Sequence, residues 1–274
     1  MSFFAAEVGR VEVIGDRSGD PTNDGGGCEV SSQDHGPIFM VSPINALLEG
    51  LYETPLTLFE LAKHGDFGIG TFNDLDGEML RVDGVTYQLD LDGQAHQPPL
   101  HTGTPFAAVC KFKPYASEPL AALSGHVALE AHLDQCLLSR NMMFAIRVDA
   151  RFSWVRTRSV PKTHNYTPLV EATALQKVTD FKNISGTMVG FYTPAFMPSI
   201  NVPGYHFHFI SQDRLHGGHL FDFELIEGQV SLQLCSQLVL NLPMTTDYLG
   251  AEFLRDARAD IEKAFRAPGV ESSG

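Results

Sequence analysis

One stretch of the sequence decides how the rest of the chain is interpreted: Pro203-Gly-Tyr-His-Phe-His-Phe-Ile-Ser-Gln-Asp-Arg-Leu-His-Gly-Gly-His219. Successive side chains of a strand point to opposite faces, so His206 and His208 project from one face and the phenylalanines beside them from the other. Residues 212–218 have the composition of a hairpin turn, because the two adjacent glycines tolerate positive φ. Such a turn places His219 on the neighbouring strand, where it can face the first two histidines.

Three imidazoles that converge from two paired strands form a metal site of the catalytic zinc type, with one position open for water or substrate. The same ligands also suit iron, cobalt or nickel. The alternative is that these histidines are ordinary strand residues whose nitrogens are satisfied by hydrogen bonds. The third histidine after a Gly-Gly hairpin favours the metal site. His216 lies in the turn itself and is expected to be exposed rather than a ligand.

Outside this stretch, helix and strand patterns occur in separate runs, which favours an α+β fold over a doubly wound parallel sheet. Alternating or apolar runs predict strands at residues 79–82, 85–91, 106–112, 144–148, 152–155, 186–192, 205–210, 219–226 and 229–235. Helical spacing predicts helices at residues 43–51, 55–62, 119–138, 166–176 and 248–265. Ser42 and Thr54, each followed by proline, are expected to cap the first two helices.

These elements suggest two β-sheet-rich subdomains with flanking helices and the three-histidine site on paired strands of the C-terminal subdomain. We expect a variable N-terminal segment with a flexible Gly-rich insertion (1–37), an N-terminal α+β domain (38–160), a C-terminal metal-binding α+β domain (161–247), and a C-terminal helix and tail (248–274).

Composition narrows the classes of partner. The chain has 274 residues, 19 Lys+Arg against 33 Asp+Glu, and a net charge of -14, which disfavours nucleic acid and anionic membranes. No apolar run approaches the roughly 18 residues of a membrane span, and the N-terminus lacks the basic segment of a signal peptide. The four cysteines, Cys28, Cys110, Cys136 and Cys235, form no C-x-x-C pair, so reduced thiols and a cytoplasmic location are expected.

Two further groups of polar residues are candidates for chemistry. By composition alone, Asp74, Asp76 and Glu78 indicate a solvated turn that leads into a strand. Arg156 and Arg158 are two residues apart on a predicted strand and share a face. An arginine there is usually a surface charge, but it is also the best side chain for gripping a carboxylate through two hydrogen bonds.

Several of these motifs occur together in one known family. The matching stretches are Asn45-Ala-Leu-Leu-Glu-Gly-Leu-Tyr52, Glu60-Leu-Ala-Lys-His-Gly-Asp-Phe-Gly-Ile-Gly-Thr-Phe72, Leu75-Asp-Gly-Glu78, Thr104-Pro-Phe-Ala107, Thr157-Arg-Ser-Val160, Pro168-Leu-Val-Glu171, Gly186-Thr-Met-Val-Gly-Phe191 and the histidine stretch. In this set and this order, the chain resembles the alpha-acetolactate decarboxylases, metal-dependent enzymes that produce acetoin.

The resemblance implies a two-domain α+β subunit, usually a homodimer, that converts (S)-2-acetolactate to (R)-acetoin and CO2 through a zinc-stabilised enediolate. It implies Zn2+ as the cofactor, held by His206, His208 and His219. Glu78 and Arg158 match the family's active-site glutamate and arginine. Thr71 matches a threonine near the substrate.

One departure from the family pattern concerns the C-terminal helix. Phe265 stands where the family has a glutamate, and Glu262 or Glu271 is a substitute only if the register of the tail differs. Two alternatives therefore stay open: the same scaffold acting on a different 2-hydroxy or β-keto acid, or a non-catalytic descendant that binds a metal or small acid. A cupin oxygenase is a weaker alternative, because Ser211-Gln212 stand where that pattern has a glutamate.

Overall fold

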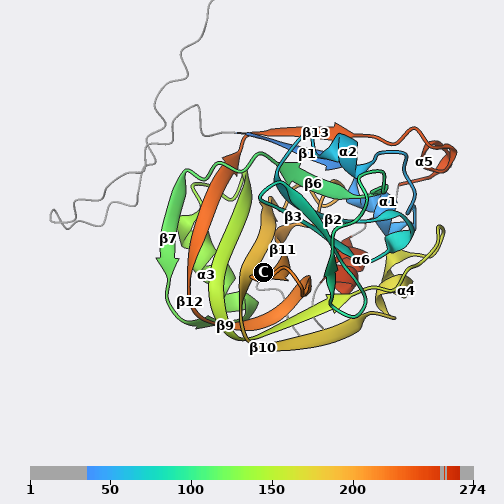
Figure 1. Ribbon diagram of the computed structural model, residues 1–274. Helices are drawn as coiled ribbons and strands as arrows, with labels where there is room; N and C mark the ends of the chain where they lie inside the picture. Colours follow the sequence, from blue (N-terminus) through green and yellow to red (C-terminus); the bar gives the residue numbers. More distant parts are fainter. Residues whose placement is uncertain (1–35, 254–255, 257, 266–274) are drawn as a thin grey trace, which may run out of the picture. The chain divides into compact units, whose positions relative to one another are not determined.

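Two β-sheets and a few short helices make up the part of the chain that the structure, a computed structural model, describes: residues 36–253, 256 and 258–265 (Figure 1). These residues belong to one compact unit, Ser31–Gly274. The predicted α+β class is confirmed, as is the pair of strand-rich halves. Among the described residues, no helix is both long and apolar enough to cross a bilayer.

The first sheet has seven strands. Their order is β13 (Gln237–Asn241), β1 (Pro37–Val41), β6 (Ala107–Cys110), β2 (Phe67–Thr71), β3 (Glu78–Val82), β4 (Val85–Leu89) and β5 (Ala95–His96). Strands β1 and β13 are parallel and the other pairs are antiparallel. The central strands β2 and β3 are buried along their whole length, which the nearly unbroken apolar composition of β2 allows.

The second sheet has six antiparallel strands, three of them very long. They are β11 (Gly204–Ser211), β10 (Lys177–Thr193), β9 (Met143–Ser159), β12 (Gly217–Cys235), the edge strand β7 (Ala116–Leu120), and β8 (Leu123–Ser124), which pairs with β12. Strand β11 also pairs with β12, so β11, β10, β9 and β12 form a closed circuit. This closure is what brings the histidines of β11 and β12 together.

A glycine permits one of the close approaches in this sheet. A Cβ atom on Gly190 of β10 would lie 2.3 Å from the backbone oxygen of His206 and equally close to the ring of Phe207. Only glycine therefore lets β11 sit at this distance from β10. The position of His206 depends on that contact.

The helices are short. They are α1 (Ile44–Leu48), α2 (Leu58–Leu61), the 3-10 turn Asn73–Leu75, α3 (Gly125–Cys136), α4 (Leu169–Thr173), α5 (Thr246–Gly250) and α6 (Arg258–Phe265). Thr57 and Thr245 cap α2 and α5 through their hydroxyl oxygens, which accept from backbone N–H groups three residues later.

One large apolar core joins the two sheets. Its buried side chains include Ile38, Phe67 and Leu80 from the first sheet and Val189 and Ile210 from the second. Strand β11 packs against β3, and β10 packs against β2 and β3. Side chains at the ends of β3 and β11 are therefore neighbours although they lie far apart in the sequence.

Several predicted boundaries are wrong. Ser42 does not cap α1: it has φ 61° and its N–H donates to Asn241, which continues the β1–β13 pairing. Thr54 does not cap α2, because its hydroxyl donates to the Thr104 carbonyl. The predicted helix 119–138 begins at Gly125, since residues 116–120 form the edge strand β7.

The remaining differences concern length. The predicted strands 144–148 and 152–155 are one strand, β9, and 219–226 and 229–235 are one strand, β12. The predicted helix 248–265 is divided, because α5 ends at Gly250 and Ala251 is extended. The domain boundary at residue 160 stays a prediction; the sheets divide the chain differently, because β7 and β9 belong to the second sheet and β13 to the first.

Candidate active site

The three histidines of the sequence prediction meet where β11 and β12 pair. His208 lies directly opposite His219 in the register, and His206 is on the same face of β11. Each offers a ring nitrogen, and these three atoms lie within 4.8 Å of one another. The His206 Nε2 atom is 3.2 Å from the His219 Nδ1 atom. All three rings are buried.

Burial keeps these rings neutral. Burial, aided by the neighbouring Arg158 cation, lowers the pKa of His206 and His219 well below the usual value and the pKa of His208 to about 3. Neutral imidazole is the form that binds a metal ion. The site therefore holds three uncharged ligands at neutral pH.

Hydrogen bonds to backbone carbonyls fix which nitrogen is unprotonated in His208 and in His219. His208 Nδ1 donates to the Met79 carbonyl at 2.8 Å, which leaves its Nε2 lone pair unprotonated, and that buried Nε2 has no hydrogen-bond partner. His219 Nε2 is 3.3 Å from the Phe265 carbonyl and is the donor there, so the Nδ1 lone pair faces His206. The Nε2 lone pair of His208 and the Nδ1 lone pair of His219 thus face the cluster, where a bound cation would replace the 3.2 Å hydrogen bond between His206 Nε2 and His219 Nδ1. Backbone carbonyls commonly orient ligating histidines in this way.

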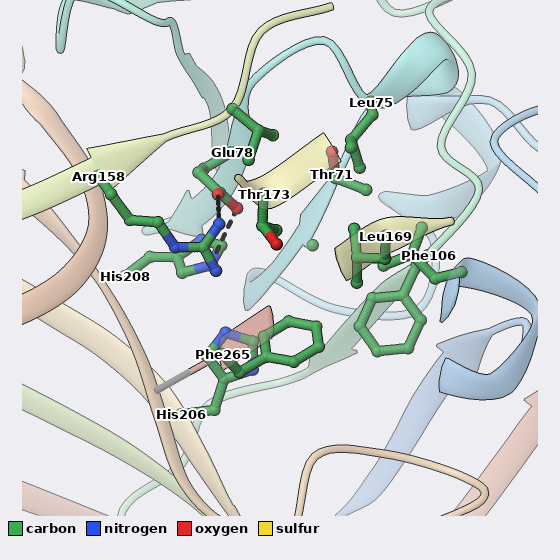
Figure 2. A pocket seen from close by; sticks show the side chains of 13 residues that line it. Thr71, Leu75, Glu78, Phe106, Arg158, Leu169, Thr173, His206, His208 and Phe265 are labelled. Atoms are coloured by element: carbon green, nitrogen blue, oxygen red, sulfur yellow. Dashed lines mark hydrogen bonds and ion pairs between the residues drawn. The ribbon is translucent and has the colours of Figure 1, made fainter. Parts of the chain in front are cut away.

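A buried ion pair lies beside the histidines. Glu78 is the first residue of β3, and its Oε1 atom is 3.4 Å from Arg158 Nη1 on β9 (Figure 2). Its Oε2 atom is 3.4 Å from His208 Nε2. Burial raises the pKa of Glu78, and Arg158 opposes that shift; burial likewise lowers the pKa of Arg158. The raised pKa makes Glu78 a candidate proton donor in the pocket.

The C-terminal helix closes this side of the site. Arg158 Nη2 donates to the Ala264 carbonyl at 2.9 Å, which satisfies one of the orphan carbonyls at the end of α6. The ring of Phe265 lies 5.3 Å from that of His206, centroid to centroid. Glu262 is exposed on α6, and Glu271 lies outside the described residues. In the structure a phenyl ring therefore stands beside the histidines.

A small pocket, with a free volume of about 20 Å³, lies between the two sheets at this point (Figure 2). Its polar wall holds Glu78, Arg158, His206, His208, Thr71 and Thr173. Its apolar wall holds Leu47, Leu75, Phe106, Val160, Leu169 and Phe265. The Thr71 hydroxyl donates to the Gly77 carbonyl at 2.7 Å, so this side chain also fixes the turn that precedes Glu78.

Other residues considered in the sequence lie elsewhere. Arg156 forms an exposed ion pair with Asp180, so only Arg158 of the two arginines reaches the pocket. Asp74 pairs with Lys162 and His164. His216 is outside the cluster of three ring nitrogens, and its ring contacts Phe181.

Two contributors were missed from the sequence. The first is the Met79 carbonyl, which a sequence cannot single out because every residue carries one. The second is Thr173, at the end of the short helix α4, whose polar side chain gave no spacing signal.

Comparison with known proteins identifies the family. The sequence model described as "Alpha-acetolactate decarboxylase" matches residues 38–255. The chain belongs to the alpha-acetolactate decarboxylase family. It is therefore an enzyme of the decarboxylase (carboxy-lyase) class. The protein named alpha-acetolactate decarboxylase from Methanosarcina mazei is 41% identical over 236 residues, which is 86% of this chain and 82% of that protein. The Bacillus subtilis protein of the same name is 40% identical over 84% of this chain and 91% of its own length.

Solved structures agree with the assignment. The crystal structure of alpha-acetolactate decarboxylase from Bacillus subtilis strain 168 superposes with a TM-score of 0.82 at 39% identity and covers 84% of this chain and 100% of that one. A Staphylococcus aureus protein described as similar to alpha-acetolactate decarboxylase superposes with a TM-score of 0.78 at 27% identity, covering 83% of this chain and 97% of that one. The fold of this chain is that of the decarboxylase family.

Proposed function

We propose that this decarboxylase converts (S)-2-acetolactate, 2-hydroxy-2-methyl-3-oxobutanoate, to (R)-acetoin and CO2. The observation that carries the proposal is a pocket lined by a buried arginine, a buried glutamate and two histidines, which form a cluster of three with the adjacent His219. Arg158 together with a divalent cation on the histidines would outweigh the single negative charge that Glu78 carries when ionised, so the pocket would be net positive whether or not Glu78 is protonated. Such a pocket suits an anionic 2-hydroxy-3-oxo acid.

His206, His208 and His219 would hold the cation, and three nitrogen ligands with an open position suit Zn2+. When bound, the cation supplies a fixed positive charge that stabilises the electron pair left on the substrate's ketone oxygen as CO2 departs. No other cofactor is required, because the ketone next to the carboxylate-bearing carbon accepts that electron pair.

Arg158 would bind the substrate's carboxylate before it leaves. Its Nε–H group is buried and has no acceptor, and its contact with Glu78 is long at 3.4 Å. An unsatisfied buried donor costs about 1–3 kcal/mol, which an incoming carboxylate recovers. Because the Ala264 carbonyl holds Nη2, the guanidinium keeps a fixed orientation towards the pocket.

Glu78 would supply the proton that replaces CO2. When the bond from the second carbon to the carboxyl carbon breaks, its electron pair moves to the neighbouring ketone; protonation of the second carbon then gives the product. The carboxyl of Glu78 is buried, its pKa is raised, and it adjoins both Arg158 and His208. Delivery of this proton from one side of the pocket sets the configuration of acetoin.

The test is to incubate zinc-loaded protein with fresh racemic 2-acetolactate and to follow acetoin on a chiral column, with a chelated sample as control. We expect (R)-acetoin to form rapidly, with about half of the racemic substrate consumed in the fast phase and the reaction abolished by the chelator. Tight zinc binding without acetoin formation would overturn the proposed substrate.

A different 2-hydroxy or β-keto acid is the second candidate, and Phe265 is the observation that favours it. This ring contacts His206 and His219 and supplies no proton donor or acceptor from its side chain. A panel of acids that differ in the alkyl group of the second carbon, assayed by CO2 release, separates the two candidates. A higher kcat/KM for an acid other than acetolactate would favour the second.

Assembly and location also belong to the proposal. We expect a homodimer, and the edge strand β13 offers exposed apolar side chains, Val239 and the nearby Leu242, to a second copy. Sedimentation velocity of the purified protein measures this directly, and a single monomer boundary would contradict it. A cytoplasmic location stays a prediction.

A further inference from the structure

A second group of metal-ligand side chains lies away from the pocket, between α3 and the edge strand β7. His132 and Cys136 are four residues apart on α3, so both project from the same face of the helix. Glu118 of β7 faces them: its Oε1 atom is 2.9 Å from His132 Nε2 and 2.7 Å from Cys136 Sγ. The three potential ligand atoms all lie within 4.8 Å of one another.

We propose that Glu118, His132 and Cys136 form a second metal site, distinct from the three-histidine site, that binds Zn2+ or a similar borderline cation. One carboxylate, one imidazole and one thiolate are all zinc ligands, and the sulfur disfavours Mg2+ and Ca2+. The side chains of His132 and Glu118 are 35% and 43% exposed, so an ion and a water molecule as fourth ligand can reach the site from solvent.

Tetrahedral coordination of a zinc ion would require only a small movement of these three side chains. Both donors now point at one oxygen of Glu118, and a cation placed between the three atoms would replace the two shared protons. Ligand atoms around tetrahedral zinc are about 3.3–3.8 Å apart, given bond lengths of about 2.0–2.3 Å. The observed contacts of 2.7 and 2.9 Å must therefore open by about 1 Å or less, which half-exposed side chains allow.

Thiol catalysis does not explain the group. In a nucleophilic triad the histidine lies between the cysteine and the carboxylate, whereas here the carboxylate lies between the other two. Burial and the adjacent Glu118 raise the pKa of the Cys136 thiol to about 12, so it is no thiolate nucleophile at neutral pH. Coordination would release the thiol proton to water and move the ring proton of His132 from Nε2 to Nδ1.

Metal binding at this site would cross-link strand β7 to helix α3. Strand β7 is at the edge and, among the described residues, pairs with β12 alone, while α3 contacts β12 and β8. A metal bound by one residue of β7 and two of α3 would join an edge strand to the helix beside it. The site would thus stabilise structure and take no part in decarboxylation.

The experiment compares metal uptake by four purified proteins: the wild type, Cys136→Ser, His206→Ala and the double variant. After equilibration with excess zinc and removal of unbound metal, we expect two, one, one and no zinc ions per chain. Cobalt substitution identifies the ligands, because only a thiolate gives a sulfur-to-cobalt charge-transfer band and the three-histidine site contains no sulfur. The band should be present in the wild type and in His206→Ala and absent from Cys136→Ser.

The control is Gln135→Ala, a change of the exposed neighbour on α3, which should keep both the band and the second zinc ion. Cys136→Ser should keep the decarboxylase rate of the wild type. Uptake of a single zinc ion by the wild type would overturn the proposal. A cobalt band that survives in Cys136→Ser would also overturn it, because the band would then come from another cysteine.

Discussion

Replacement of Arg158 by methionine tests the physical basis of the site. The change removes a buried cation but keeps much of the side chain's length. Glu78 then loses the positive group 3.4 Å away, and the Ala264 carbonyl loses a donor at 2.9 Å. Both side chains of the pair are nearly inaccessible, at 2% and 9% exposed, so solvent cannot replace the lost partner. Breaking such a pair destabilises a protein by about 3–5 kcal/mol.

The assay is urea unfolding at pH 7 of metal-free Arg158→Met, Glu78→Gln and the double variant. We expect Arg158→Met to lose about 3–5 kcal/mol and the double variant to recover part of it, because no unpaired charge remains. The loss should shrink as the pH falls. In Arg158→Met the folded-state pKa of Glu78 is raised without opposition, so protonation in acid relieves the buried charge.

Arg156→Met is the matched control. It removes the same side chain two residues away on β9, but from an exposed pair with Asp180. Solvent screens that pair, so the unfolding free energy should hardly change. Two results would contradict a buried charge pair: a loss of less than about 1 kcal/mol of unfolding free energy in Arg158→Met, or a double variant that is no more stable than Arg158→Met.

Three further predictions follow from the site. His208→Ala should lose tight zinc binding and the decarboxylase rate together, as measured by metal analysis and acetoin formation. If the variant keeps both, His208 is not a zinc ligand. Glu78→Gln should keep its zinc but lower kcat by about 10²–10⁴-fold, since proton transfer is removed. Chelated wild-type protein should lose stability as the pH falls below about 6.5, by about 1.4 kcal/mol per pH unit for each histidine that stays neutral when folded and charges when unfolded. The folded-state pKa of His208 is about 3, so the stability lost through this residue should grow steadily from about pH 6.5 down to about pH 3. An unfolding free energy that stays constant over this range would contradict the prediction.

The sequence predicted the histidine site in some detail because its logic is local. Strand alternation puts His206 and His208 on one face, and a turn returns the chain so that His219 lies opposite. The register His208–His219 shows this pairing. The predicted role of the two glycines is wrong, because residues 212–216 make the turn with Arg214 at φ 62°, and Gly217 and Gly218 are the first residues of β12. The spacing could not show the tautomers of His208 and His219, because the carbonyl groups that accept their ring N–H bonds belong to residues 79 and 265.

The role of Glu78 could not be predicted from local pattern. The acidic turn before it indicates solvent, and Asp74 does pair with surface groups. Glu78 is buried because β3 packs against β11, a contact between residues about 130 positions apart. Only the resemblance to the family marked this residue. The burial of Glu78 depends on long-range packing, which the composition of the turn before it cannot predict.

Strand lengths were underestimated for a related reason. The sequence predicted two strands, 144–148 and 152–155, in a region that carries three charged residues, Arg147, Asp149 and Arg151. In the structure Arg147 and Arg151 pair with acidic groups on the outer face, Asp83 and Glu227 among them, while Val148 faces the core. The charges thus occupy alternate positions of a continuous strand, one face wet and the other apolar.

The seam between the two sheets explains why the site forms where it does. Strand β3 supplies two adjacent groups: the carboxylate of Glu78 and the carbonyl of Met79 that orients His208. The histidines and Arg158 come from the other sheet. Any shift of β3 therefore moves Glu78, the proposed proton donor, together with the carbonyl that orients His208, a proposed metal ligand. Packing at the seam would thus couple the position of the acid to the metal affinity. Core substitutions beneath β3, such as at Leu80, should consequently change zinc affinity and rate in parallel although they touch neither the metal ligands nor the substrate.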